Sequence, residues 1–278
     1  MVIKELLKIG RDTIKDTEYT NGLNESRQIL SFLLKVDNSY LYAYSDEEVS
    51  EKIAEEFIEM AQKRSEGYPL QYLLGSVEFM GLEYQTSENV LIPRTDTEFL
   101  VERIISENKS EIDFDILEIG VGSGIISLTL GNEFKDSKVT GVDISDYALK
   151  LANKNKENLK IDNVRFIKSN LYENVVDKYD IIVSNPPYIP SDDIDGLQVE
   201  VAVHEPRIAL DGGNDGLDFY REIIVNSTSY LKKKGKLYFE IGYNQGEDIK
   251  KLLIDNGFRE VEIIIDFAGN DRVVRGEL

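Results

Sequence analysis

The first part of the chain carries apolar residues at the spacing of helix faces. They recur at Ile29, Leu30, Leu33 and Leu34, and again at Val49, Ile53, Phe57 and Met60. Apolar positions three and four apart form one stripe on a helix, and such stripes pack together in the core of a bundle. Ser45 to Glu48 reads as a capping box before the later of these helices. Residues 1–75 are therefore predicted to form a small helical bundle.

The pattern of apolar and polar positions changes beyond residue 75. Residues 76–92 alternate and contain Gly81, which predicts a β-hairpin that links two parts of the chain. From residue 93 onward, strand-like runs alternate with helical segments such as 216–231 and 245–256. The strand-like runs lie at 115–119, 138–143, 164–168, 180–184, 236–241 and 261–266, and a last run at 272–278 is predicted as an antiparallel edge strand.

Alternation of strands and helices is typical of an α/β fold. We expect residues 93–278 to form a doubly wound, seven-stranded Rossmann-like sheet beside the helical bundle. Ligands of such sheets bind outside the carboxyl ends of the strands, where the strand order reverses. Residues that directly follow a predicted strand are therefore the first candidates for a site.

Composition narrows the class of protein. The 278 residues include 32 basic and 52 acidic side chains, a net charge of −20, and no cysteine. An acidic chain lacks the clustered Lys and Arg that grip nucleic-acid phosphates, and residues 1–75 alone hold 9 basic against 14 acidic residues. The amino terminus has no apolar signal region, and no stretch approaches the roughly 20 apolar residues of a membrane span. We expect a cytosolic protein that binds neither nucleic acid nor a membrane.

A glycine-rich turn follows the first predicted strand of the sheet. It consists of Gly120, Val121, Gly122, Ser123 and Gly124 and leads into an apolar helix. Glycines let the backbone approach a ligand closely at a helix start, so the turn is suited to NAD, to another nucleotide or to no ligand at all.

The second strand ends at Asp143. A carboxylate there either accepts hydrogen bonds from both ribose hydroxyls of a nucleoside or caps the next helix, a role that Ser145 fills equally well. Together with the glycine-rich turn, Asp143 predicts a cofactor that bears a nucleoside. These two features do not separate NAD from S-adenosylmethionine.

The segment SNPPYIP, residues 184–190, ends the fourth predicted strand. Asn-Pro is a common turn, but this turn also suits a planar NH₂ group that must accept a methyl group. Asn185 offers a side-chain carbonyl and Pro186 a backbone carbonyl, while Pro187 restricts the backbone before it. Tyr188 offers a flat face. Such chemistry rests on proximity and orientation, so His204 is expected to be structural, and we predict no metal site.

Four segments resemble the release-factor glutamine methyltransferase family, whose members are class I S-adenosylmethionine-dependent enzymes. The segments are LIPRTDTE (91–98), IIVSNPPYI (181–189), EPRIALDGG (205–213) and DFAGNDR (266–272). The likeness runs from about residue 65 to the last residue, and the helical part fits by length and type. NPPY alone also occurs in DNA and RNA adenine-N6 methyltransferases, which remain the alternative function.

The resemblance implies that the enzyme methylates the glutamine of the Gly-Gly-Gln motif in class 1 peptide chain release factors. It also implies that residues 1–75 help to dock that partner. S-adenosylmethionine would contact residues 120–124, Asp143, Asn170, Leu171 and Asn185. The substrate amide would contact Asn185, Pro186, Pro187 and Tyr188.

Two positions depart from the pattern of the family. Asn170 stands where relatives often carry aspartate, and Leu171 stands where some carry a large aromatic residue. The PRTDTE segment is expected to cover the cofactor pocket. Arg94 and Glu98 of this segment either take part in the site or form a structural salt bridge, and the sequence does not decide between the two.

Overall fold

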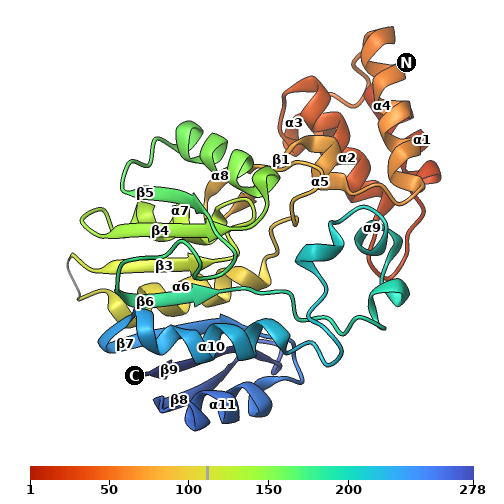
Figure 1. Ribbon diagram of the computed structural model, residues 1–278. Helices are drawn as coiled ribbons and strands as arrows, with labels where there is room; N and C mark the ends of the chain where they lie inside the picture. Colours follow the sequence, from red (N-terminus) through yellow and green to blue (C-terminus); the bar gives the residue numbers. More distant parts are fainter. Residues whose placement is uncertain (111–112) are drawn as a thin grey trace. The chain divides into compact units, whose positions relative to one another are not determined.

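A computed structural model of the chain describes residues 1–110 and 113–278 (Figure 1). The chain divides into two compact units. The first contains Met1–Gly75 together with Gln198–His204, and the second contains Ser76–Leu197 and Glu205–Leu278. The chain therefore leaves the second unit after Leu197, contributes a short segment to the first, and returns at Glu205. None of the helices in the described ranges is long and apolar enough to span a membrane.

The first unit is helical. Its helices are α1 (Ile3–Thr13), α2 (Gly22–Leu34), α3 (Asn38–Ala43), α4 (Glu51–Ser65), α5 (Leu70–Leu74) and α9 (Val199–Ala202). Leu6, Ile29, Leu30 and Phe57 are fully buried at the centre of its core. Gly10 of α1 allows the helices to approach closely, because a Cβ there would lie 2.6 Å from the ring of Phe57.

The predicted capping box is wrong. Helix α4 begins five residues later than Ser45 would require, and the Ser50 hydroxyl accepts a hydrogen bond from the Ile53 N–H at 3.4 Å. The carbonyl oxygens of Ser45 and Glu47 instead accept hydrogen bonds from the first N–H groups of α1. The segment 45–48 thus satisfies the start of another helix, a tertiary role that local sequence spacing does not encode.

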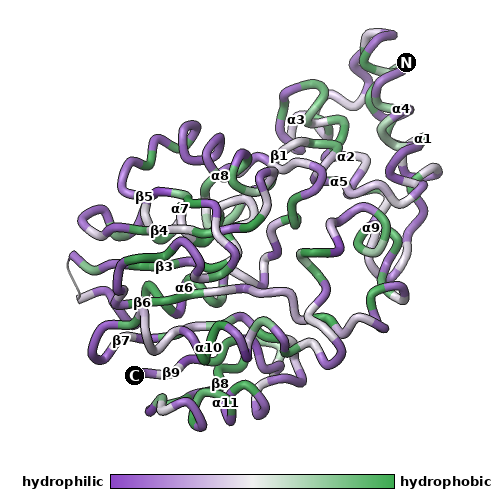
Figure 2. Tube along the Cα trace, viewed as in Figure 1, coloured by the Kyte–Doolittle hydropathy of each residue, from purple (hydrophilic) through white to green (hydrophobic). Residues whose placement is uncertain are grey.

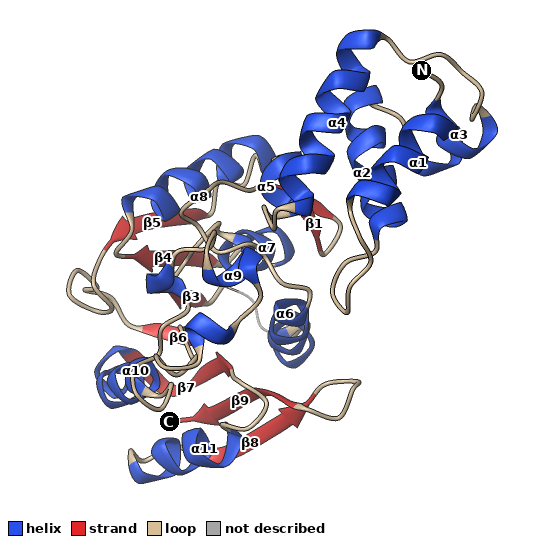
Figure 3. Cartoon of the chain, turned by 90° about the vertical axis from the view of Figure 1, so that its right-hand side faces the viewer, coloured by secondary structure: helices blue, strands red, loops and turns tan. Residues whose placement is uncertain are grey.

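The second unit is built on seven strands. They are β3 (Asp115–Ile119), β4 (Lys138–Asp143), β5 (Val164–Lys168), β6 (Tyr179–Ser184), β7 (Leu231–Glu240), β8 (Arg259–Ile265) and β9 (Asp271–Glu277). Their order across the sheet is β5-β4-β3-β6-β7-β9-β8, as Figure 3 shows. The first five are parallel, and β9 runs antiparallel to both neighbours. The predicted doubly wound sheet is confirmed. A separate hairpin joins β1 (Ser76–Phe79) to β2 (Leu82–Gln85).

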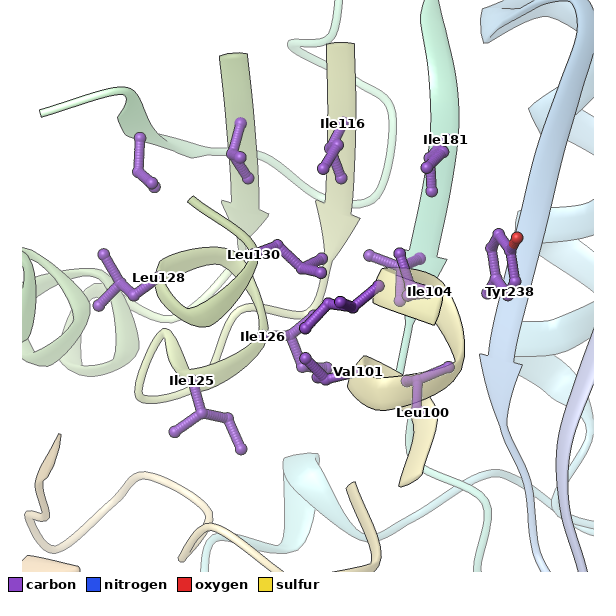
Figure 4. Close-up of a cluster of buried hydrophobic side chains, with 14 of the residues drawn as sticks. Leu100, Val101, Ile104, Ile116, Ile125, Ile126, Leu128, Leu130, Ile181 and Tyr238 are labelled. Carbon is purple, nitrogen blue, oxygen red and sulfur yellow. The ribbon is translucent and has the colours of Figure 1, made fainter. Parts of the chain in front are cut away.

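Helices cover both faces of the sheet because successive strand residues point to opposite faces. Ile116 of β3 packs with α6 (Asp96–Asn108) and α7 (Ile125–Glu133) in one buried cluster (Figure 4). Leu117 belongs to a second cluster with α10 (Asp218–Tyr230) and α11 (Gly246–Asp255). Helix α8 (Asp146–Leu159) packs on β4 and β5. Figure 2 shows the hydrophobic residues of β3 and β6 running through the middle of the sheet.

Two details of the sheet differ from the sequence prediction. The last strand, β9, is not at the edge: it inserts between β7 and β8, with Val273 and Val274 fully buried. Strand β7 begins at Leu231, five residues earlier than predicted, because Leu231 pairs with Tyr179 ahead of a register shift. The charged residues Lys232 to Lys234 interrupt the apolar pattern near its start, which is why the strand was predicted to begin only at residue 236.

Candidate active site

A cavity of about 230 Å³ lies at the carboxyl ends of β3, β4, β5 and β6. This is where the strand order reverses: β4 and β5 follow β3 on one side, and β6 and β7 lie on the other (Figure 1). Its walls include six of the residues singled out from the sequence as cofactor contacts, namely Gly120, Gly122, Asp143, Asn170, Leu171 and Asn185. Pro186 and Pro187 line it as well.

The glycine-rich turn needs its glycines for two different reasons. Gly120 and Gly122 have φ angles of 80° and 55°, and a Cβ at either position would meet no atom within 4 Å. Their free faces therefore leave room in the cavity. Gly124 precedes α7 with φ 88°, and a Cβ there would come within 3.1 Å of Ala152. It serves close packing of α7 against α8 rather than the cavity wall.

Asp143 holds the glycine-rich turn from the neighbouring strand. One carboxylate oxygen accepts a hydrogen bond from the Gly122 N–H at 2.9 Å, and the other accepts from the Ser145 N–H at 2.8 Å. Burial raises the pKa of Asp143, while these two backbone donors oppose that rise. The N-cap of α8 is Ser145, whose hydroxyl accepts from the Ala148 N–H at 3.3 Å. The carboxylate of Asp143 is therefore not the helix cap, and each of its oxygens keeps a lone pair for a ligand.

Asn170 and Leu171 follow β5 on the same edge of the sheet. Leu171 adopts a left-handed backbone with φ 46°, and its carbonyl accepts a hydrogen bond from the Ser169 hydroxyl at 2.8 Å. The side chain of Leu171 also packs against the second buried cluster. An aliphatic wall thus stands at the position where some relatives carry an aromatic ring.

Asn185 follows β6 and faces the start of α6. Its side-chain Nδ2 donates a hydrogen bond to the Thr97 hydroxyl at 3.3 Å. Glu240 ends β7, the strand beside β6, and is 1% exposed. Burial raises the pKa of Glu240 to about 7, and hydrogen bonds from Thr97 and Asn185 oppose that rise. Neither Thr97 nor Glu240 was singled out from the sequence, because neither stands in the Asn-Pro-Pro-Tyr motif.

Tyr188 is set back from the cavity. Its carbonyl accepts a hydrogen bond from the Gln245 side chain at 3.0 Å, and its ring packs against the second buried cluster. Burial raises the pKa of its hydroxyl to about 12. Within the described ranges, the cavity wall contains neither Tyr188 nor three of the predicted cofactor contacts, Val121, Ser123 and Gly124.

The PRTDTE segment lies next to the cavity rather than in its wall. The residues just before it, Asn89 to Leu91, line the cavity, as do Pro206, Ile208 and Ala209. Glu205 joins these two stretches by pairing with Arg94 and by accepting a hydrogen bond from the Ile92 N–H at 3.2 Å.

Arg94 and Glu98 of the PRTDTE segment, whose roles the sequence left open, thus have structural partners. Arg94 makes the ion pair with Glu205, and Glu98 accepts a hydrogen bond from the Met80 N–H at 2.9 Å. His204 belongs to the helical unit, where its ring meets the edge of Tyr68 at 5.1 Å.

This mostly parallel seven-stranded sheet, with a glycine-rich turn and a carboxylate around one cavity and an Asn-Pro-Pro turn beside it, has the architecture of a class I methyltransferase. A methyltransferase structure from Pyrococcus furiosus shares the fold, with a TM-score of 0.54 and 22% identity over 72% of this chain and 90% of that chain. Residues 94–269 match the family model of the methyltransferase small domain, and residues 5–75 match that of the PrmC N-terminal domain.

Curated relatives narrow the family. The release factor glutamine methyltransferase of Fusobacterium nucleatum is 48% identical over 94% of this chain and 75% of its own length. That of Clostridium botulinum is 36% identical over 99% of both chains. The chain belongs to the release factor glutamine methyltransferase family, as its four sequence segments indicated.

Proposed function

We propose that this protein transfers a methyl group from S-adenosylmethionine to the side-chain amide nitrogen of the glutamine in the Gly-Gly-Gln motif of class 1 release factors. The observation that carries the proposal is the position of Asn185 and Pro186. Both line a cavity whose other walls are a glycine-rich turn and a buried carboxylate. The identity of the methyl acceptor is inferred from the family. Relatives that align with most of this chain are named release factor glutamine methyltransferases.

The cavity fits a nucleoside-bearing cofactor. Open space faces Gly120 and Gly122, where any side chain would intrude. Asp143 is held by two backbone N–H groups and retains lone pairs for ribose hydroxyls. Leu171 and Asn170 offer an aliphatic surface and an amide at the end of β5 for the base. When bound, S-adenosylmethionine supplies an electrophilic methyl group on a sulfonium.

The residues that follow β6 would bind the methyl acceptor, the side-chain amide of glutamine. An amide nitrogen is a weak nucleophile because its lone pair is delocalised into the carbonyl. The side-chain oxygen of Asn185 and the backbone oxygen of Pro186 would accept hydrogen bonds from the two N–H groups of the glutamine amide and so orient its nitrogen toward the methyl group. Transfer of the methyl group would break its bond to the sulfonium, leave S-adenosylhomocysteine, and make the alkylated nitrogen acidic enough to release a proton to water. Tyr188 lies outside the cavity wall, and its packed ring would act by fixing the turn that carries Asn185 and Pro186.

The helical unit is the part of the chain that we propose to dock the release factor. Within the described ranges, all residues that line the cavity belong to the second unit, so the first has no part in holding the cofactor. A protein substrate that offers one loop to the cavity needs further contact area elsewhere. We assign that contact to residues 1–75 and place the activity in the cytosol, where release factors act.

Transfer of a labelled methyl group tests the function directly. Purified class 1 release factor should be labelled, and the same factor with the Gly-Gly-Gln glutamine changed to alanine should not. Duplex DNA and ribosomal RNA serve as the competing acceptors. Labelling of either nucleic acid in place of the factor would assign the chain to the adenine-N6 enzymes that share NPPY.

A further inference from the structure

Three chain segments meet behind Asn185. Thr97 lies in the first turn of α6, Asn185 directly follows β6, and Glu240 ends β7. Ser184 and Phe239 are register partners on the parallel strands β6 and β7, so the residues that follow them, Asn185 and Glu240, are neighbours. Thr97 and Glu240 are each 1% exposed, which leaves solvent little access to their polar atoms.

The orientation of the Asn185 amide follows from its donors and acceptors. A carboxamide has two N–H donors on nitrogen and two lone pairs on oxygen. The nitrogen of Asn185 donates to the Thr97 hydroxyl at 3.3 Å, and Asn185 also lowers the pKa of the neighbouring Glu240 carboxyl by hydrogen bonding. Above about pH 7, where Glu240 is ionised, turning the amide over would place its carbonyl oxygen against a carboxylate that has only lone pairs to offer. The nitrogen therefore faces inward and the oxygen faces the cavity.

We infer that Thr97 and Glu240 are positioning residues that take the two amide hydrogens of Asn185 and so present its oxygen to the methyl acceptor. The inference rests on the proposed function and deepens it. Thr97 accepts one hydrogen and Glu240 the other, so neither competes for the oxygen that the substrate needs. One oxygen of Glu240, Oε2, has no hydrogen-bond partner within the described residues.

Two charged side chains act on Glu240 in opposite directions. The Arg272 guanidinium lowers the pKa of Glu240, whereas Asp96 raises it. Arg272 itself is fixed by Asp96 at 3.1 Å and by Asp266 at 3.2 Å, and its side chain is 13% exposed. Charged residues of the PRTDTE and DFAGNDR segments thus lie around Glu240, the residue that we place behind Asn185.

Single-turnover methylation at saturating cofactor tests the inference. Thr97→Val and Glu240→Leu, which each remove a hydrogen-bond acceptor, should each lower the rate roughly 10- to 100-fold, the cost of a reacting group displaced by up to about 1 Å. Thr97→Ser retains the hydroxyl and should stay within about threefold of wild type. The matched control is Tyr220→Phe, which removes a buried hydrogen bond of 2.8 Å to the backbone carbonyl of Glu240 and leaves its carboxylate untouched.

A double-variant comparison separates positioning from a general loss of structure. In an Asn185→Ala background, Thr97→Val and Glu240→Leu should have no further effect on the rate, because the residue they position is absent. Calorimetric affinity for S-adenosylmethionine should stay within about threefold of wild type in the single variants, because neither residue lines the cavity. Additive losses in the double variants, or a Thr97→Ser variant as slow as Thr97→Val, would overturn the inference.

A readout without substrate keeps the inference distinct from the proposed function. In ¹⁵N-correlated NMR spectra, the Asn185 side-chain NH₂ pair, identified by its loss in Asn185→Ala, should exchange slowly with water. Both hydrogens should shift and exchange faster in Thr97→Val and Glu240→Leu. If this is seen while the wild-type enzyme fails to methylate release factor, the proposed function falls and the positioning stands. An NH₂ pair that exchanges freely in wild type would refute the positioning alone.

Discussion

The carboxylate of Glu205 accepts a hydrogen bond from the backbone N–H of Ile92 at 3.2 Å, although 113 residues separate them in the chain. The same carboxylate pairs with Arg94 and is itself 5% exposed. Cavity-lining residues stand directly beside each end of this contact: Asn89 to Leu91 before Ile92, and Pro206 after Glu205. One buried side chain thus holds two walls of the proposed cofactor pocket together.

Changing Glu205 should loosen those walls. Glu205→Ala leaves the Ile92 N–H without its acceptor and Arg94 without its partner, which should cost about 1–3 kcal/mol of stability. Affinity for S-adenosylmethionine should fall roughly tenfold, because both walls are then free to move. Calorimetry and thermal unfolding give the two quantities. Asp177→Ala is the control: it breaks the exposed pair with Arg165 and should change stability by less than about 0.5 kcal/mol. Unchanged affinity in a folded Glu205→Ala protein would show that the walls hold without this contact.

A side chain at Gly122 should block the cofactor. Valine there would project into space that is now open, and we expect affinity for S-adenosylmethionine to fall at least about 100-fold. The left-handed backbone of Gly122 also strains any β-branched residue, so a control must carry the same strain. Gly257→Val supplies it: φ is 92°, the site is equally open, and it lies just after α11, away from the cavity. Both variants should lose stability, and only Gly122→Val should lose binding. Equal affinities in the two would refute this placement of the cofactor.

Two buried carboxyl groups should make stability depend on pH. Burial raises the pKa of Glu118 to about 8 and that of Glu240 to about 7, from 4.5. The folded state therefore keeps protons that the unfolded state has already released, and stability is lost as pH rises from about 4.5 to 8. Glutamine at either position has no proton to lose. The melting temperature of Glu118→Gln and of Glu240→Gln should therefore rise relative to that of wild type as pH increases from about 4.5 to 8. Exposed Glu102→Gln controls for one lost negative charge. A difference from wild type that stays constant from pH 5 to 9 would contradict this account.

The helical unit should respond to the loss of Arg64. Its guanidinium, on a side chain 5% exposed, pairs with Glu25 at 2.6 Å and with Glu200 of α9 at 2.7 Å. Arg64→Ala leaves Glu25 buried without its partner, which costs about 3–5 kcal/mol. Limited proteolysis should then cut within residues 1–75, KM for intact release factor should rise, and calorimetric affinity for S-adenosylmethionine should hold. Arg11→Ala, which breaks an exposed pair with Asp12, is the control. An unchanged KM with the helical unit opened would rule out its docking role.

Local pattern was enough to predict most of the sheet and not enough to place its last strands. The bounds of β3, β4 and β5 match the predicted runs, because each is a short run flanked by turn residues. The position of β9 between β7 and β8 depends on which partners bury Val273 and Val274. Pairing between distant strands is not encoded in the spacing of one run, so local pattern could not distinguish an inserted strand from an edge strand.

Some residues of the candidate site could likewise be predicted from the sequence and others could not. Gly122, Asp143 and Asn185 were found because each stands at or just after the end of a strand and carries its chemistry in its own side chain or backbone. Thr97 and Glu205 act through partners 88 and 113 residues away, and their types are common in ordinary helix starts and surface loops. The resemblance marked their segments without assigning roles. Glu240 ends a buried strand, where burial alone distinguishes it from a surface glutamate.

Single-turnover methylation of release factor by Asn185→Ala, at saturating S-adenosylmethionine, tests the central claim most directly. The variant loses one acceptor for the glutamine amide and keeps both prolines of the turn. Its rate should fall on the order of 10²- to 10³-fold, as when a preorganised hydrogen-bonding group is removed from a transition state. Tyr188→Phe keeps the flat ring and should react within about threefold of wild type, while Tyr188→Ala should be slow. A folded Asn185→Ala enzyme that methylates the factor at the wild-type rate would contradict the account.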